Sequence, residues 1–163
     1  MAAKALPVIL CGQSQAIASV VAKNLLPEVR GTLLNPPSNI TIRLVLNLYA
    51  VVHTILSPSS GVASLPGYLT SSPDSSSTND QERPVAVVYG AAYTDTDVRN
   101  MLRACTPESK QGIYWLRADT SVSMPPPGPE YGLKMVGRVK KCLERLNQEG
   151  KLGNASMEEE VKY

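Results

Sequence analysis

The sequence predicts an α/β domain of the Rossmann or flavodoxin type, with three layers and a mainly parallel sheet of four or five strands. Short apolar runs at 6–11 and 84–89 are typical of strands that are buried on both faces. Helical patterns separate such runs, and this alternation implies a parallel sheet with right-handed crossovers. The length of 163 residues suits one domain of ordinary size.

The first predicted strand and helix form a strand–loop–helix unit. The strand covers 6–11 and ends at Gly12, and Ser14 then opens a helix that Pro27 stops. Apolar side chains recur along this helix at the spacing that places them on one side. They are Ile17, Val20, Val21, Leu25 and Leu26.

Two further strands are predicted in the middle of the chain. One covers 51–56 and ends at the turn signal Ser57–Pro58, and a short helical turn is expected at 62–68. The other covers 84–89 and is broken by Gly90.

The last part of the chain contains two predicted helices and one strand. Thr94 is expected to cap a helix, with Asp97 three residues later in a capping-box arrangement. A strand follows at 112–117. The second helix begins at Pro129, a residue that fits the first helical position, and ends at Gly150.

We expect one domain over 1–150, with an atypical insertion at 31–50, a flexible loop at 70–82 and a frayed tail at 151–163. The insertion interrupts a connection that needs only a few residues. Two interpretations of it stay open. It is either a genuine inserted strand or hairpin, or a retained intron whose removal in frame would leave a short connection into the next strand.

Composition and charge exclude several classes of function. Only 18% of the residues are charged and the net charge is +2, which argues against nucleic acid because phosphate binding needs clustered Lys and Arg. The longest apolar stretch, 40–56, contains Arg43, Asn47 and His53 and is too short and too polar to span a bilayer. We therefore expect neither nucleic acid nor a membrane as a partner.

Cysteine and histidine usage predicts a reducing compartment and no metal site. The three cysteines, Cys11, Cys105 and Cys142, are far apart, and no two have the spacing of zinc ligands. His53 is the only histidine. We interpret the cysteines as reduced, buried thiols and expect a cytoplasmic protein.

The loop after the first predicted strand carries the main functional signal. Segment 11–18, Cys-Gly-Gln-Ser-Gln-Ala-Ile-Ala, resembles the Thr-Gly-x-x-x-Gly-Ile-Gly fingerprint of short-chain dehydrogenases, which implies NAD or NADP as cofactor. Gly12 and Ile17 match this pattern, and Ser14 lies where those enzymes often have serine. Three positions depart from it, and these are Cys11, Ala16 and Ala18.

Two interpretations of this loop stay open. In the first, Gly12 allows close backbone approach, and free N–H groups at the helix start hold a phosphate. In the second, Gly12 only turns the chain and Ser14 caps the helix. The first interpretation makes Gly12, Gln13, Ser14, Gln15 and Ile17 candidate cofactor-binding residues.

The rest of the dehydrogenase pattern is missing. The Tyr-x-x-x-Lys pair is absent, since Tyr131 and Lys134 have the wrong spacing. No acidic residue ends the second predicted strand to hold a ribose, and Ser57 lies there instead. Dehydrogenase activity therefore does not follow from the resemblance.

The chain as a whole also resembles small Rossmann-like, NAD(P)-binding-domain-like proteins of fungi without an assigned function. The segments that carry this resemblance are 7–12, 87–90, 115–119 and 128–131. It implies the fold and NAD(P) binding, and it supplies no catalytic residue.

Three more candidate cofactor-binding residues follow predicted strands, at the edge where such sheets bind ligands. Gly90 and Tyr93 follow the third strand, and Asp119 follows the fourth. The alternative for Tyr93 is packing at a rim, and the alternative for Asp119 is a cap or loop hydrogen bond. His53 lies within a strand and is more typical of a core or edge residue than of a catalytic base.

The leading prediction is a nucleotide-binding domain for NAD or NADP, with catalysis left open and catalytic residues unknown. The alternative is a non-enzymatic protein-interaction module that keeps the fold without the ligand. Exposed apolar surface and assembly into a homo-oligomer would favour this alternative. A third candidate is a flavodoxin-like carrier. It would need a hydroxyl-rich first loop for FMN, and only Ser14 fits that requirement.

Overall fold

Five parallel strands form the centre of the structure. The computed structural model describes residues 5–25, 49–70, 83–152 and 160–163. The strands lie in the order β2-β1-β3-β4-β5, and each neighbouring pair is parallel. They are β1 (Leu6–Cys11), β2 (Tyr49–Ile55), β3 (Ala86–Tyr89), β4 (Tyr114–Arg117) and β5 (Glu160–Lys162). The predicted α/β class with a parallel sheet is confirmed.

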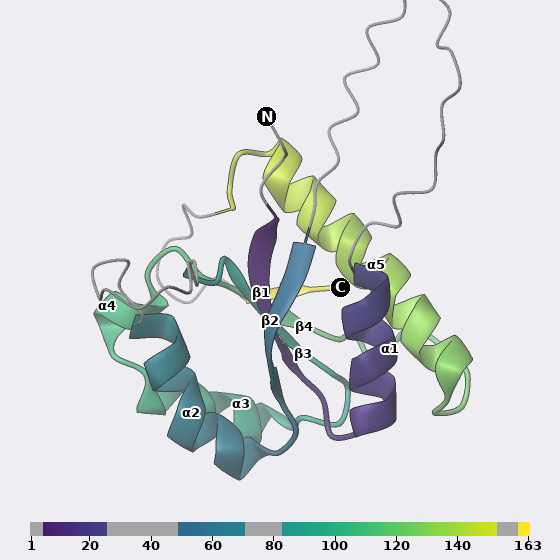
Figure 1. The fold of residues 1–163 in the computed structure, drawn as a ribbon, viewed down its shortest axis with the longest axis horizontal. Helices are drawn as coiled ribbons and strands as arrows, with labels where there is room; N and C mark the ends of the chain where they lie inside the picture. Colours follow the sequence, from purple (N-terminus) through teal and green to yellow (C-terminus); the bar gives the residue numbers. More distant parts are fainter. Residues whose placement is uncertain (1–4, 26–48, 71–82, 153–159) are drawn as a thin grey trace, which may run out of the picture.

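Helices cover both faces of the sheet and complete the three layers (Figure 1). Two of them pack on one face and two on the other, with the single-turn α4 beside the second pair. The first pair is α1 (Gln15–Leu25) and α5 (Pro129–Gln148), and the second is α2 (Pro58–Thr70) and α3 (Asp95–Ala104), followed by α4 (Pro107–Lys110). The strand order is the one found in flavodoxin-like folds.

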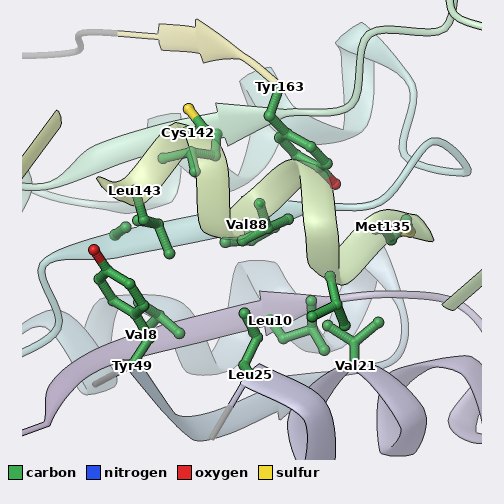
Figure 2. Close-up of a cluster of buried hydrophobic side chains, with 14 of the residues drawn as sticks. Val8, Leu10, Val21, Leu25, Tyr49, Val88, Met135, Cys142, Leu143 and Tyr163 are labelled. Atoms are coloured by element: carbon green, nitrogen blue, oxygen red, sulfur yellow. The ribbon is translucent and has the colours of Figure 1, made fainter. Parts of the chain in front are cut away.

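A separate apolar core lies on each face because side chains alternate along the central strands. In β1, Val8 and Leu10 point into the core beneath α1 and α5, which Figure 2 shows. Ile9 and Cys11 point into the core beneath α2 and α3. All four are buried, which accounts for the continuous apolar run in the sequence.

Tyrosines supply most of the aromatic packing, since the chain contains no Phe. Tyr49 and Tyr163 belong to the α1/α5 core, and Tyr89 stacks on Trp115 in the other. The hydroxyl of Tyr163 donates a 2.9 Å hydrogen bond to the carbonyl oxygen of Tyr89. Within the described residues, the hydroxyls of Tyr49 and Tyr89 have no hydrogen-bond partner.

The last crossover differs in hand from the other three. The crossovers through α1, α2 and α3 are right-handed, as expected (Figure 1). α5 packs on the same face as α1, yet β5 lies beyond β4, on the far side of the sheet from β2. The β4-α5-β5 crossover is therefore left-handed. The sequence analysis predicted no strand after the last helix, so its right-handed crossovers concern only the units that join β1 to β4.

The end of the predicted frayed tail is folded, which corrects that prediction for residues 160–163. Glu160–Lys162 form β5 beside β4, and Tyr163 is buried. The backbone N–H of Tyr163 donates to the carbonyl oxygen of Arg117, and its own carbonyl oxygen accepts from Asp119, both at 2.9 Å. Burial of Val161 and Tyr163 against the α1/α5 core holds this strand in place. Residues 153–159 of the predicted tail lie outside the described residues.

Element boundaries also differ from the sequence prediction at the starts of β2, α2, β3 and β4. β3 begins at Ala86 instead of residue 84, and β4 begins at Tyr114 instead of residue 112. β2 begins at Tyr49, so the last two residues of the predicted insertion belong to the sheet, where Tyr49 is buried opposite Leu6. The expected helical turn at 62–68 is part of the longer α2, because Ser57 caps its start by accepting a 3.2 Å hydrogen bond from the backbone N–H of Ser60. The rest of the predicted insertion, 31–48, and the loop at 71–82 lie outside the described residues.

The predicted starts of α3 and α5 are confirmed. The Thr94 hydroxyl accepts from the backbone N–H of Asp97, and the Asp97 carboxylate accepts from the backbone N–H of Thr94. Pro129 occupies the first turn of α5. Both features were readable from the sequence because they depend on residues within one helical turn.

Replacing Tyr163 with alanine should lower the free energy of unfolding by about 3 kcal/mol, because the change leaves a cavity in the core and removes the hydrogen bond to Tyr89. Denaturant unfolding measures this. The control is Lys162→Ala, an exposed neighbour in the same strand, which should change stability by less than about 0.5 kcal/mol. Equal small effects of both substitutions would contradict a folded tail.

Candidate functional site

A pocket of about 420 Å³ lies at the carboxyl ends of β1 and β3, the point where the strand order reverses and where sheets of this kind bind ligands. Its volume is within the range of small-molecule sites, about 300–1,000 Å³. Three segments line it: the end of β1 with the first turns of α1, the loop after β3, and the start of α5. The lining residues are Leu10, Cys11, Gly12, Gln13, Ser14, Ile17, Ala18, Val21, Gly90, Ala91, Ala92, Pro127, Tyr131 and Met135.

Gly12 turns the chain from the sheet into the pocket wall. Its backbone N–H donates a 2.9 Å hydrogen bond to the carbonyl oxygen of Ile55, so this amide belongs to the sheet and cannot bind a ligand. A Cβ added at Gly12 would meet no atom within 4 Å. Glycine is therefore not needed here to avoid a clash within the protein. Its lack of a side chain leaves open space beside the pocket.

The first turn of α1 offers free amides beside the pocket. Ser14 caps the helix, since its hydroxyl accepts a 3.4 Å hydrogen bond from the backbone N–H of Ile17. The amides of Gln15 and Ala16 precede that bond and have no acceptor among the described residues. They carry the positive end of the helix dipole, where an anion is favoured.

Hydrogen bonds join the two loops that form the pocket rim. The Gln13 side-chain amide donates to the carbonyl oxygen of Ala92 at 3.1 Å. The backbone N–H of Gly90 donates to the carbonyl oxygen of Cys11 at 2.8 Å. A Cβ on Gly90 would lie 3.3 Å from that same oxygen, so glycine permits the close approach of the two strand ends.

The structure brings together five of the eight sequence-predicted residues. Gly12, Gln13, Ser14, Ile17 and Gly90 all line the pocket. They meet because carboxyl ends of adjacent parallel strands open on the same edge of a sheet.

The other three predicted residues do not line it. The side chain of Gln15 is exposed and donates to the Ser19 hydroxyl at 3.4 Å. Tyr93 turns into the α2/α3 core, where its hydroxyl donates to the carbonyl oxygen of Ile55 at 3.1 Å. Asp119 lies in a neighbouring pocket, and its carboxylate accepts hydrogen bonds from Ser121.

Sequence reasoning missed the third wall of the pocket. Pro127, Tyr131 and Met135 come from the start of α5, which packs on the same face as α1. The stiff loop of prolines before Pro129 was the available signal, since it fixes where the helix begins. Nothing in the sequence indicated which face of the sheet α5 covers.

The pocket is suited to binding more than to acid–base chemistry. None of its lining residues carries a carboxylate, ammonium, guanidinium or imidazole group. Burial raises the pKa of the Cys11 thiol, which disfavours a reactive thiolate. His53 lies away from this pocket and stacks on Tyr68, with ring centroids 3.7 Å apart, and burial lowers its pKa.

The described part of the chain contains no group of three or more His, Cys, Asp or Glu side chains arranged to hold a metal ion. None of its helices combines the length and apolar character needed to cross a membrane.

Comparison with known proteins places the chain in a family. Over 147 residues it is 30% identical to "Kojic acid related protein 6" of Aspergillus oryzae (strain ATCC 42149 / RIB 40), an alignment that covers 89% of this chain and 80% of that protein. The chain belongs to the same family as that protein. This relative is fungal, in agreement with the fungal resemblance of the sequence.

The kojic acid related family is the only classification that these comparisons support. No model of a known protein family matches the chain, short-chain dehydrogenases included. No solved structure matches it either.

Thiol labelling of the native protein should be slow at Cys11, Cys105 and Cys142. All three are buried, and burial raises the pKa of each thiol, so the thiolate fraction at mildly alkaline pH falls below that of an exposed cysteine. A chromogenic disulfide reagent measures this, with denatured protein as reference. A Ser19→Cys variant, which places a thiol at an exposed position of α1, should label rapidly. Rapid labelling of the unsubstituted native protein would contradict the buried thiols.

Proposed function

We propose that the protein binds a nucleotide in the pocket between β1 and β3. The observation that carries the proposal is the combination of free α1 amides and an apolar cavity at the strand-order reversal. The amides of Gln15 and Ala16 would bind a phosphate, and the base or ring would lie against apolar side chains such as Ile17 and Met135.

The departure from the dinucleotide fingerprint at Ala16 does not block this pocket. Ala16 is exposed and is absent from the pocket lining, so its methyl group does not fill the cavity. Ala18 is buried in the α1/α5 core, where a small side chain still allows the helix to pack closely on the sheet. NAD and NADP therefore remain the first ligands to test.

FMN is a second candidate because of the strand order. The order β2-β1-β3-β4-β5 is that of flavodoxin-like sheets, which hold a mononucleotide at the β1/β3 switch point. A dinucleotide is usually bound across two mononucleotide-binding halves. The loop still offers only Ser14 as a hydroxyl, and that hydroxyl caps α1.

The relative's name adds one small molecule to the candidate ligands NAD, NADP and FMN. That protein is described as related to kojic acid. We infer that this chain takes part in related chemistry, with the nucleotide supplying any redox function. A reducing compartment such as the cytoplasm fits the three free cysteines.

The interaction-module alternative has weaker support. The exposed large apolar side chains lie on different elements, with Leu56 after β2, Val62 on α2, Val122 in the loop after β4 and Leu133 on α5. Scattered single residues of this kind are common on soluble proteins and do not by themselves mark an interface.

A thermal-shift panel with NAD, NADH, NADP, NADPH, FMN, FAD, ATP and kojic acid tests the proposal. A nucleotide at about one hundred times its dissociation constant should add about 2.7 kcal/mol, which raises Tm by several degrees. Gly12→Val should abolish this shift, because its side chain would enter the open space beside the pocket without striking the protein.

The matched control is Gly137→Val, which also adds a side chain where no atom lies within 4 Å, but on the exposed side of α5. This variant should keep the full nucleotide shift. No shift with any nucleotide would overturn the proposal. A shift that survives Gly12→Val would place binding elsewhere.

A further inference from the structure

A second pocket, of about 300 Å³, lies at the carboxyl end of β4 beside the pocket described above. Ala91, Tyr131 and Met135 line both pockets and so form their common boundary. The second pocket differs in carrying a carboxylate, from Asp119, and we call it the Asp119 pocket. The proposed nucleotide site leaves this carboxylate without a role.

One oxygen of the Asp119 carboxylate is left to accept hydrogen bonds. Oδ1 accepts from the backbone N–H of Ser121 at 3.0 Å and from its hydroxyl at 2.6 Å. Among the described residues, no group donates to Oδ2. The Ser121 hydrogen bonds also lower the pKa of Asp119, so the group is a charged acceptor at neutral pH.

The main chain of Asp119 is held from two sides. Its carbonyl oxygen accepts a 3.1 Å hydrogen bond from the Arg138 guanidinium of α5, and its N–H donates to the carbonyl oxygen of Tyr163 at 2.9 Å. The Arg138 guanidinium also donates to that Tyr163 oxygen. The carboxylate therefore projects from a fixed point, which is the arrangement that orients a ligand.

The rest of the Asp119 pocket combines apolar side chains with the polar residues Thr120, Ser123 and Arg138. Tyr131 offers an aromatic ring, while Met124 and Met135 offer polarisable thioethers that adapt to a flat surface. Arg138 lines the pocket too, but its guanidinium already donates to two backbone oxygens. The pocket thus offers one anionic acceptor and the hydroxyl-bearing residues Thr120 and Ser123 beside an apolar surface.

We propose that the Asp119 pocket binds a neutral planar ring that carries neighbouring hydroxyl groups. The hydroxyls donate to Oδ2 of Asp119, and the ring lies against Tyr131 and Met135. An anionic ligand is disfavoured because it would approach the carboxylate, and a purely apolar ring would leave that carboxylate desolvated without a donor. This inference goes beyond the proposed nucleotide site and does not depend on a bound nucleotide.

Titration of the nitrogen-15-labelled protein, without nucleotide, tests the inference by NMR. The probe is catechol, a flat ring with two adjacent hydroxyls, and its matched control is 1,2-dimethoxybenzene, which has the same ring and no donor. Catechol should shift the amide signals of 118–124 and bind at least about tenfold more tightly than the dimethoxy compound, the factor expected for hydrogen bonds to a charged group.

Asp119→Asn should weaken catechol binding by about tenfold or more, because the amide replaces the charged acceptor. Glu144→Gln is the control. It neutralises an exposed carboxylate of α5 outside both pockets, and it should leave catechol affinity unchanged.

Three results would each overturn the inference. These are equal affinity for the two probes, catechol shifts confined to the pocket around Gly12, and unchanged catechol binding in Asp119→Asn. The comparison of the two probes uses the unsubstituted protein, so it decides the matter even where a variant folds poorly. Because no nucleotide is present, failure here is distinct from failure of the nucleotide proposal.

Discussion

The close packing of α5 against α1 is the contact on which the rest of the structure depends. A Cβ on Gly132 would lie only 2.9 Å from Cγ1 of Val20, so glycine allows the two helices to approach. Their shared position over one face buries Cys142 and Leu143 in the larger core (Figure 2). It also forces the chain into a left-handed crossover before β5, a connection that parallel sheets rarely use.

The same contact completes the candidate site. With α5 on the α1 face, its first turns place Tyr131 and Met135 at the carboxyl edge of the sheet, between the pocket near Gly12 and the Asp119 pocket. The first pocket has backbone amides and no charged side chain, while the second has a fixed carboxylate. Such a division suits one ligand held by its phosphate and a second held by its hydroxyls. Chemistry would then rely on the bound molecules, because no carboxylate, ammonium, guanidinium or imidazole group lines the first pocket.

Much of this arrangement could be predicted from local sequence, and the remainder depended on tertiary packing. The β1–α1 loop and the Thr94 capping box are encoded within a few residues, and parallel pairing brings Gly12 and Gly90 to one edge. Tyr93 was correctly placed after a strand, but whether its side chain faces the pocket or the core is decided by α2 and α3. The contribution of Tyr131 was hidden for a similar reason, since the sequence does not state which face α5 covers.

The composition of β5 explains why this strand escaped sequence analysis. α5 covers β4 and β5 only on the α1 face of the sheet. On the opposite face, residues of α3 lie beside β4 and β5, and several of the side chains there are charged. Val161 packs on the α1/α5 core, whereas Glu160 and Lys162 are exposed, so β5 lacks the continuous apolar run of a strand buried on both faces. Arg117 pairs with Asp95 at 2.7 Å and approaches Glu160 at 3.8 Å on this surface. Charged side chains on a short edge strand also discourage pairing with a strand of another molecule. The same charges that made residues 160–162 look like a polar tail therefore keep the edge of this sheet from pairing.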